Sequence, residues 1–299
     1  MTLTRLENLI WFLFYATICI SMKEFVRIFA LLGVLIGIIM SILAFASDES
    51  LHKEEYTYES ELVDSNLDGL KIVQLSDFHN HSLDYKNGNI IDMVKNENPD
   101  VVVLTGDLID QYTKQKHLDN IKKLLDELKE IPVFYIDGNH EEYAGLKDEF
   151  FALISSYENI KYLKDEFIKF NYHGSSINLT GLIDPRNYFH KEEKEEVVIE
   201  YQEPIVKELS DSLDDDLSIL LSHRPQLMDM YSKYKFDLVI SGHTHGGQIK
   251  LSKPKKYQSG EWKVNDKTLI VSNGIGSNAK LPVRLNCPMQ LVTITLKSK

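Results

Sequence analysis

Five short apolar runs, each followed by polar residues, stand out in the pattern of hydrophobic and polar positions along this chain of 299 residues. The runs span residues 71–75, 101–104, 133–136, 217–221 and 238–240. They are rich in branched aliphatic side chains, which is typical of strands that are buried on both faces of a parallel sheet. Segments with helical character separate the first runs, at residues 89–97, 117–130 and 146–156. This alternation of strands and helices predicts an α/β fold.

The pattern changes in the second half of the chain. Residues 174–183 are predicted to form a hairpin arm and a strand. The charged segment 188–213 has the Glu–Lys spacing of a solvated helix, and we assign it no chemistry. Residues 269–272 and 289–295 are predicted as strands of a second sheet, with a turn at residues 273–276 between them.

The first 46 residues contain two uncharged apolar stretches, at residues 9–22 and 28–46. The second is long enough to cross a bilayer. Lys23 and Arg27 lie between the stretches, and Asp48 and Glu49 follow the second, so the positive-inside rule places the remainder of the chain outside the cytoplasm. We therefore expect a membrane anchor at residues 1–46, formed by one transmembrane helix or a helical hairpin, in the cytoplasmic membrane.

Two alternatives remain for this N-terminal segment. Residues 44–46 read Ala-Phe-Ala, which matches a signal-peptidase site, so the segment can also be a cleaved signal. It can also be a pair of apolar helices in a soluble protein. If it is an anchor, residues 47–66 form a polar, charge-rich connector that includes a short strand around residues 56–63, and residues 67–299 form the globular domain outside the membrane.

The overall charge and the cysteine count narrow the functional classes. The formal net charge is −12, which argues against nucleic acid as a partner because nucleic-acid binding usually requires a basic face. Cys19 and Cys287 are the two cysteines of the chain, so a zinc site built from thiolates is excluded.

Metal-binding types of side chain follow all five apolar runs directly. In open α/β sheets, ligands bind outside the carboxyl ends of the strands, so we expect these side chains to meet at one edge. They are Asp77 and His79, then Asp107, then Asn139 with His140, then His223, and finally His243 and His245. The glycines around the last two let the backbone approach whatever is bound there. The sequence therefore predicts that these side chains together form a metal site.

The number and type of these groups predict two metal ions. Two carboxylates, one amide oxygen and four imidazoles, leaving His140 aside, are too many donors for one ion, whereas two ions sharing a bridging carboxylate would use them all. Mixed nitrogen and oxygen donors without thiolate suit divalent transition metals such as Mn, Fe or Zn. Such a pair promotes in-line displacement at phosphorus, with a hydroxide held between the ions as the nucleophile. His140 would then protonate the leaving oxygen.

Taken together, these motifs resemble those of the calcineurin-like metallophosphoesterase family. The set is Asp77-x-His79, Gly106-Asp107-x-x-Asp110, Gly138-Asn139-His140-Glu141, His223 and Gly242-His243-Thr244-His245. The extensions Gly246-Gly247-Gln248 and Gly274-Ile275-Gly276 resemble its membrane-anchored bacterial subgroup in particular. The resemblance implies two facing mixed β-sheets flanked by helices, with a dinuclear site at one edge. Where the subgroup usually has Pro-Pro-Glu, this chain has Pro288-Met289-Gln290, so the resemblance does not predict its contacts with substrate.

The resemblance also implies a role for each site residue. Asp77, His79, Asp107 and His245 would hold one ion, and Asp107, Asn139, His223 and His243 the other. His140 would assist the leaving group, and Asp110 would orient the cluster from behind.

The expected function is therefore hydrolysis of a phosphodiester, phosphomonoester or pyrophosphate bond by a membrane-anchored enzyme with an extracytoplasmic catalytic domain. We expect a phosphorylated small molecule or a lipid- or envelope-linked compound as substrate, because a tether at the membrane raises the effective concentration of substrates held there. A non-catalytic interaction protein that keeps the fold is the first alternative. A nuclease of the same family is the second.

Overall fold

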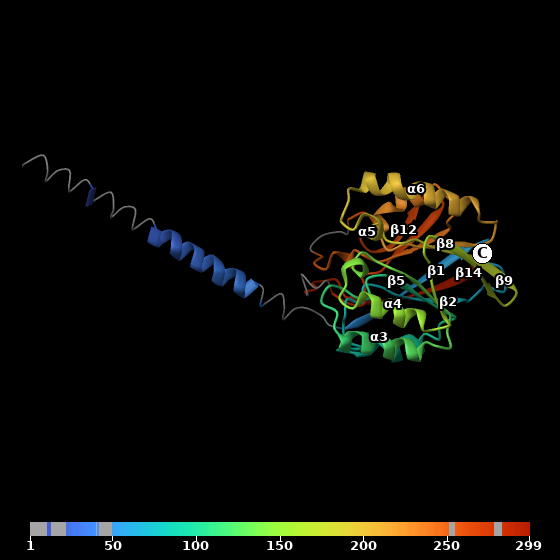
Figure 1. Cartoon of the computed structure of the whole chain (residues 1–299), viewed down its shortest axis with the longest axis horizontal. Helices are drawn as coiled ribbons and strands as arrows, with labels where there is room; N and C mark the ends of the chain where they lie inside the picture. Colours follow the sequence, from blue (N-terminus) through green and yellow to red (C-terminus); the bar gives the residue numbers. More distant parts are fainter. Residues whose placement is uncertain (1–10, 13–21, 40, 42–49, 251–254, 278–282) are drawn as a thin grey trace, which may run out of the picture. The chain divides into compact units, whose positions relative to one another are not determined.

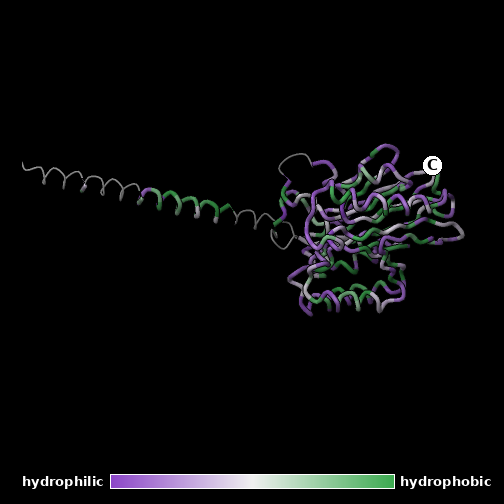
Figure 2. Tube along the Cα trace, turned by 45° about the horizontal axis from the view of Figure 1, so that its top comes forward, coloured by the Kyte–Doolittle hydropathy of each residue, from purple (hydrophilic) through white to green (hydrophobic). Residues whose placement is uncertain are grey.

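The computed structural model describes residues 11–12, 22–39, 41, 50–250, 255–277 and 283–299 of the chain (Figure 1). It divides into two compact units, Met1–Ser47 and Asp48–Lys299. In the first unit, residues 22–39 are helical and carry exposed apolar side chains such as Leu31 and Val34. Figure 2 shows that this segment is mainly hydrophobic.

The predicted spans at residues 9–22 and 28–46 fall partly outside the described residues. Within the described part of the chain, no helix combines the length and the apolar character that crossing a membrane requires.

The second unit contains two six-stranded sheets. The first has the order β1-β14-β2-β5-β6-β7, with β2, β5, β6 and β7 parallel to one another, β14 antiparallel to β2, and β1 parallel to β14. The bounds of its strands are β1 Leu51–Ser60, β14 Met289–Ser298, β2 Lys71–Leu75, β5 Val101–Thr105, β6 Val133–Ile136 and β7 Ile160–Tyr162.

The second sheet has the order β12-β13-β11-β10-β9-β8, with four parallel strands in its centre and an antiparallel strand at each edge. The bounds of its strands are β12 Gly260–Val264, β13 Lys267–Val271, β11 Leu238–Ser241, β10 Ser218–Leu221, β9 Ser175–Gly181 and β8 Glu166–Tyr172. A small hairpin consists of β3 Asp84–Tyr85 and β4 Gly88–Asn89.

Helices cover the outer face of each sheet, on opposite sides of the unit (Figure 1). Apolar residues of α2, α3 and α4 pack on the first sheet, and those of α6 and α7 pack on the second. The α-helices are α2 Ile90–Asn96, α3 Gln115–Glu127, α4 Lys147–Ser155, α5 Arg186–Phe189, α6 Glu195–Asp211 and α7 Met228–Tyr231. The 3₁₀ helices are η1 Glu141–Tyr143, η2 Pro225–Leu227 and η3 His245–Gly247.

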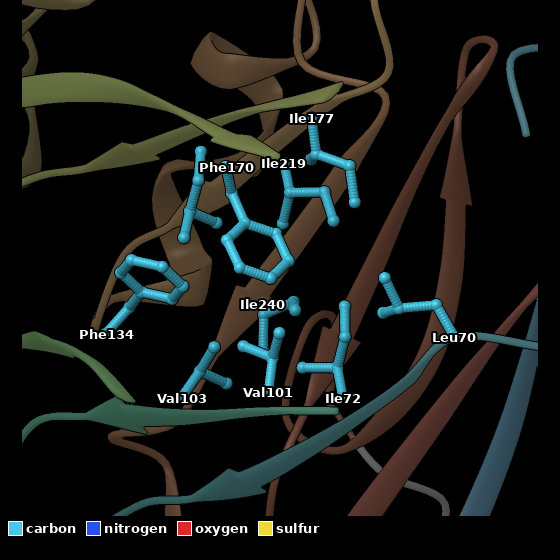
Figure 3. Close-up of a pocket in the computed structure, with 10 residues that line it drawn as sticks. Leu70, Ile72, Val101, Val103, Phe134, Phe170, Ile177, Ile219 and Ile240 are labelled. Carbon is cyan, nitrogen blue, oxygen red and sulfur yellow. The ribbon is translucent and has the colours of Figure 1, made fainter. Parts of the chain in front are cut away.

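A continuous apolar core lies between the two sheets. Side chains alternate along each strand, so Ile72 and Val103 of the first sheet face Ile219 and Ile240 of the second (Figure 3), while their sequence neighbours face the helices. The cavity left at this interface measures about 10 Å³ and has an entirely apolar lining. It is too small and too apolar to hold a ligand, so this core is structural.

The α/β prediction and the arrangement of two mixed sheets with flanking helices are confirmed. The predictions for two segments, residues 47–66 and residues 289–295, need correction. The short strand expected around residues 56–63 is present but begins earlier, as β1. Residues 51–66 are part of the folded unit and not a connector, because β1 pairs with β14 along its whole length and Leu51 and Val63 are buried. The predicted strand at residues 289–295 belongs to the first sheet, where β14 lies between β1 and β2.

Candidate metal centre

The loops that follow β2, β5, β6, β10 and β11 meet at one edge of the two sheets. Backbone hydrogen bonds join them: the N–H of Asp77 donates to the carbonyl of Gly106 (2.9 Å), and the N–H of His79 donates to the carbonyl of Asp107 (3.0 Å). The backbone N–H of His243 donates to both carboxylate oxygens of Asp77, at 3.0 Å each. The carboxyl ends of strands from both sheets therefore build a single site.

The backbone at this edge adopts an uncommon conformation. Five of the predicted site residues have a positive φ: Asp77, His79, Asp107, His243 and His245. Left-handed backbone is rare for residues other than glycine, although Asp and His accept it more readily than most, and such strained positions gather at functional sites. The strained backbone is therefore further evidence that the orientation of these side chains serves a function.

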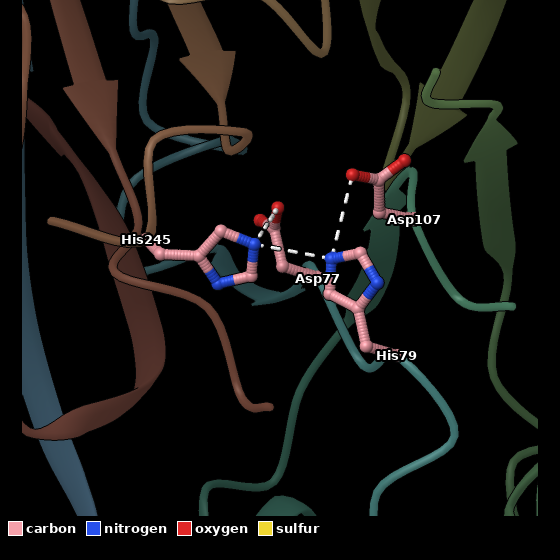
Figure 4. Close-up of side chains that lie close together, drawn as sticks. All are labelled: Asp77, His79, Asp107 and His245. Atoms are coloured by element: carbon pink, nitrogen blue, oxygen red, sulfur yellow. Dashed lines mark hydrogen bonds and ion pairs between the residues drawn. The ribbon is translucent and has the colours of Figure 1, made fainter. Parts of the chain in front are cut away.

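Four of the side chains form a first group of donors (Figure 4). Asp77, His79, Asp107 and His245 each offer one atom, and these atoms all lie within 4.8 Å of one another. The Nε2 atoms of His79 and His245 are 3.1 Å apart. Each also lies 3.5 Å from a carboxylate oxygen, that of Asp107 for His79 and that of Asp77 for His245. Four buried donors thus converge on one point.

A second group shares one member with the first. It consists of Asp107, His223 and His243, whose donor atoms also all lie within 4.8 Å of one another. Nε2 of His223 is 3.1 Å from Oδ2 of Asp107 and 3.2 Å from Nδ1 of His243. The carboxylate of Asp107 therefore lies between the two groups, in the position that a bridging ligand requires.

The residues present fit two divalent ions. Asp77 and Asp107 are both buried, and two buried carboxylates need compensating positive charge. Asn139 lines the same cavity as Asp107 and His243, and its Oδ1 is buried with no hydrogen-bond partner among the described residues. An unsatisfied buried acceptor is costly unless a ligand or ion binds it, so this amide oxygen suits a metal ligand.

The electric field of the site favours cations. Burial lowers the pKa of His223, but Asp107 and Asp77 outweigh that effect and raise it to about 10. A field that holds a proton on a buried imidazole would also hold a metal ion. Burial, together with the positive charge of neighbouring histidines, lowers the pKa of His243 and His245, so these two imidazoles are neutral, as metal ligands must be.

Neighbouring groups orient the imidazoles. Nδ1 of His223 lies 2.7 Å from the carbonyl of Thr105 and can donate to it, which leaves Nε2 free to face Asp107. Oδ2 of Asp110 lies 3.7 Å from Nδ1 of His79, on the far side of that ring from Asp107. A carboxylate or carbonyl behind a histidine fixes the tautomer and orientation that a metal requires. The structure thus places Asp110 behind His79, and its role in orienting the cluster stays a prediction.

His140 lies beside the donor groups on the wall of a cavity of about 350 Å³. Its backbone N–H donates to Oδ1 of Asp107 (2.8 Å), and its ring meets that of His79 edge-on, with the centroids 4.6 Å apart. Nδ1 of His140 has no hydrogen-bond partner within the described ranges. The structure therefore brings all nine predicted site residues together, with His140 facing the cavity.

Sequence reasoning gave no role to several residues around the site. The buried carboxylate of Glu141 accepts hydrogen bonds from the backbone N–H groups of Asp107, Leu108 and Gly138, so it ties two site loops together. Its place in the motif after His140 is a signal that could have identified it. Arg186 and Glu192 line the cavity as well, and no spacing in the sequence connects them to the motifs.

The comparison with protein families decides the identity of this site. The family model described as calcineurin-like phosphoesterase matches residues 70–247, which is more than half of the chain and includes every predicted site residue. The chain belongs to the calcineurin-like phosphoesterase family. Calcineurin-like phosphoesterases typically bind two divalent metals, in agreement with the two donor groups that share Asp107.

Individual relatives of this calcineurin-like phosphoesterase include an uncharacterized metallophosphoesterase of Campylobacter jejuni, 34% identical over 239 residues, which cover 77% of this chain and 60% of the relative. A bovine transmembrane protein with a metallophosphoesterase domain is 26% identical over 250 residues, covering 78% of this chain and 54% of the relative. Among solved structures, a Thermus thermophilus sulfate thiohydrolase aligns with a TM-score of 0.46 and 12% identity, covering 70% of this chain and 52% of that one. The chain thus spans about 60% of the length of the Campylobacter relative.

Proposed function

We propose that this calcineurin-like phosphoesterase hydrolyses a phosphate ester or anhydride bond with the help of two divalent transition-metal ions. The shared position of Asp107 between two donor groups carries the proposal. Asp77, His79 and His245 would complete one ion site, and Asn139, His223 and His243 the other. Bound ions would neutralise the phosphate oxygens and lower the pKa of a water molecule, and Mn, Fe or Zn suits the donor set.

His140 supplies the proton that the leaving group needs. Water adds to phosphorus and releases one proton to the solvent, the bond from phosphorus to the leaving oxygen breaks, and the imidazolium of His140 donates its proton to that oxygen. Two observations support this role. The side chain lines the cavity, and the hydrogen bond from its backbone N–H to Asp107 holds it beside the donor groups without making it one of them.

The substrate and location of the enzyme form a further part of the proposal. The apolar stretch at residues 28–46, with Lys23 and Arg27 before it and acidic residues after it, supports a membrane anchor with residues 67–299 outside the cytoplasm. The bovine relative is named as a transmembrane protein, which agrees with this arrangement and with the membrane-anchored subgroup. The tether would hold the site at the membrane, so the substrate is a lipid-borne or envelope-linked phosphate compound.

Metal analysis combined with a substrate panel tests the proposed activity. The purified full chain, loaded with Mn, Fe or Zn in turn, is assayed on a phosphomonoester, a phosphodiester, a pyrophosphate and a single-stranded oligonucleotide. We expect metal-dependent turnover of at least one of the first three. A loaded protein that turns over none of the four would favour a non-catalytic interaction protein, and turnover of the oligonucleotide alone would favour a nuclease.

Protease accessibility tests the location. Intact cells without their outer wall are treated with a protease, and the fragments are detected with an antibody against residues 67–299. We expect this domain to be digested without lysis. Full protection of the domain until the membrane is opened would contradict the proposed topology.

A further inference from the structure

The cavity beside the metal centre extends to a second wall that carries an arginine. The cavity measures about 350 Å³, which is more than one phosphate group occupies, and Arg186 and Glu192 line it together with His140 and Tyr143. Arg186 is the first residue of α5, and its side chain is 20% exposed. This wall is separate from the donor groups and has no part in holding metal.

The hydrogen-bonding capacity of Arg186 is only partly used. Nη1 donates to Oε1 of Glu192 at 3.1 Å, and the guanidinium carbon lies 4.8 Å from the centre of the Tyr143 ring. Nε is buried and has no hydrogen-bond partner in the part of the chain that the structure describes. A buried donor without a partner is unfavourable, so the arrangement leaves Arg186 ready to bind an acceptor.

A chain of alternating charges holds Arg186 in place. Arg224 binds Asp184 through two hydrogen bonds of 2.7 and 3.0 Å and binds Glu192 through a third of 3.0 Å. Asp184 also accepts the backbone N–H of Arg186 at 2.8 Å. Arg224 thus has a buried carboxylate partner, Asp184, as well as Glu192, whereas Arg186 is the last charged side chain of this series and lies at the cavity. Glu192 is 53% exposed, so it can yield to another anion.

The position of Arg186 relative to His140 shows which part of a substrate it would meet. The rings of His140 and Tyr143 are 5.1 Å apart between centroids, and Arg186 packs on Tyr143 at 4.8 Å. The three side chains are therefore in successive contact along the wall, from His140 through Tyr143 to Arg186. Because His140 protonates the leaving oxygen in the proposed function, Arg186 lies on the side where the leaving group departs.

We infer that Arg186 binds an anionic group on the leaving portion of the substrate. This inference rests on the proposed function, because it takes His140 as the proton donor. A guanidinium with unused donors, stacked on an aromatic ring, recognises the planar or tetrahedral oxygens of a carboxylate or a phosphate. The substrate class is therefore a phosphate ester or anhydride whose leaving group carries its own negative charge, as the second phosphate of a pyrophosphate does.

Matched aryl phosphates test this inference. The probes are phenyl phosphate, 4-(carboxymethyl)phenyl phosphate and 4-(phosphonomethyl)phenyl phosphate, in which a methylene insulates the phenol from the added charge, so the three leaving groups have similar intrinsic reactivity. Arg186→Gln in the full chain should lower kcat/KM by about 10–100-fold on a charged probe and by less than about 3-fold on phenyl phosphate. The two charged probes show whether a carboxylate or a phosphate is preferred.

Two further variants make the result decisive. Arg186→Lys should lose less than the glutamine variant on the charged probes, because it keeps the charge without the planar fork. It also carries the test if the glutamine variant fails to fold. Lys297→Gln removes an exposed charge on β14, where it pairs with Glu59, and should change none of the three rates.

The outcomes separate this inference from the proposed function. If the wild-type chain hydrolyses all three probes and Arg186→Gln slows them equally, or slows none, the inference fails and the proposed function stands. If the metal-loaded wild-type chain hydrolyses no phosphate ester or anhydride, both fail together. A selective loss on the charged probes, with the metal content unchanged, supports the inference.

Discussion

Glu141→Gln is a sharp test of how the site loops are held. The Glu141 side chain is fully buried, and its two carboxylate oxygens accept three backbone N–H groups. Oε2 accepts from Asp107 (3.1 Å) and Gly138 (2.9 Å), and Oε1 accepts from Leu108 (2.7 Å). Glutamine has nearly the same shape but replaces one acceptor oxygen with an NH₂ group, so one N–H donor must face another donor.

The size of the effect follows from these contacts. The less damaging orientation keeps the two hydrogen bonds at the Oε2 position and leaves the N–H of Leu108 without a partner. An unsatisfied buried donor costs about 1–3 kcal/mol. We therefore expect a loss of about 1–3 kcal/mol in the free energy of unfolding. For a unit of this size, this corresponds to a midpoint lowered by about 2–12 °C.

Thermal unfolding of the metal-free chain, followed by circular dichroism, measures this change. Glu200→Gln, at an exposed position of α6, is the matched control and should alter stability by less than about 0.5 kcal/mol. Burial, together with the nearby carboxylates of Asp107 and Asp137, raises the pKa of the Glu141 carboxyl well above its usual range, so the prediction rests on the lost acceptor and not on a lost charge. An unchanged midpoint in Glu141→Gln would refute the reasoning.

Three further predictions concern the acid, a loop glycine and a buried carboxyl. His140→Ala should keep the metals and lose rate by about 10²–10⁴-fold, mostly on alkyl leaving groups, and equal losses on nitrophenol esters would contradict a proton donor. In Gly138→Ala the new Cβ would lie 2.2 Å from Oδ1 of Asp107, so metal content measured by elemental analysis should fall. Burial raises the pKa of Asp165 to about 6, so the folded state loses stability as the pH rises from about 4 to about 6. Asp165→Asn should therefore raise the unfolding midpoint at pH 8 and change it much less at pH 4, and the same gain at both values would contradict this.

The sequence was sufficient to predict which candidate metal ligands lie together, because their placement follows from a local rule. Each lies directly after a short apolar run, and parallel strands bring their carboxyl ends to one edge. Asp77 and His243 follow strands of different sheets, and the hydrogen bonds from the backbone N–H of His243 to the carboxylate of Asp77 could not be predicted from the sequence. The strand ends thus predict which residues meet, while long-range pairing decides how they meet.

The full extent of β1 and its place in the first sheet could not be predicted, for a physical reason. This strand has the sequence Leu-His-Lys-Glu-Glu-Tyr-Thr-Tyr-Glu-Ser, and most of its side chains are exposed or half-buried. A strand at the edge of a sheet is held mainly by backbone hydrogen bonds to its neighbour, here β14, which is more than 200 residues away in the sequence. Neither the charged composition of β1 nor the apolar pattern of β14 indicates which sheet they share.

The part of the cavity lined by Arg186 and Glu192 could not be predicted from the sequence either. Arg186 and Glu192 fall around a short helix, and Arg224 follows a strand of the second sheet. Charged residues at such spacings usually form solvated surfaces. Arg186 and Glu192 line the cavity because the fold packs Arg186 on Tyr143 of η1, a contact between distant parts of the sequence.

The metal content of Asp107→Ala tests the central claim most directly. Elemental analysis after removal of loosely bound metal should find two ions per chain in the wild-type protein and in the control Asp126→Ala, which removes an exposed carboxylate of α3. Because the carboxylate of Asp107 belongs to both donor groups, its loss should weaken both sites together, leaving less than one ion per chain. Retention of two tightly bound ions in Asp107→Ala would contradict a shared ligand and with it the dinuclear centre described above.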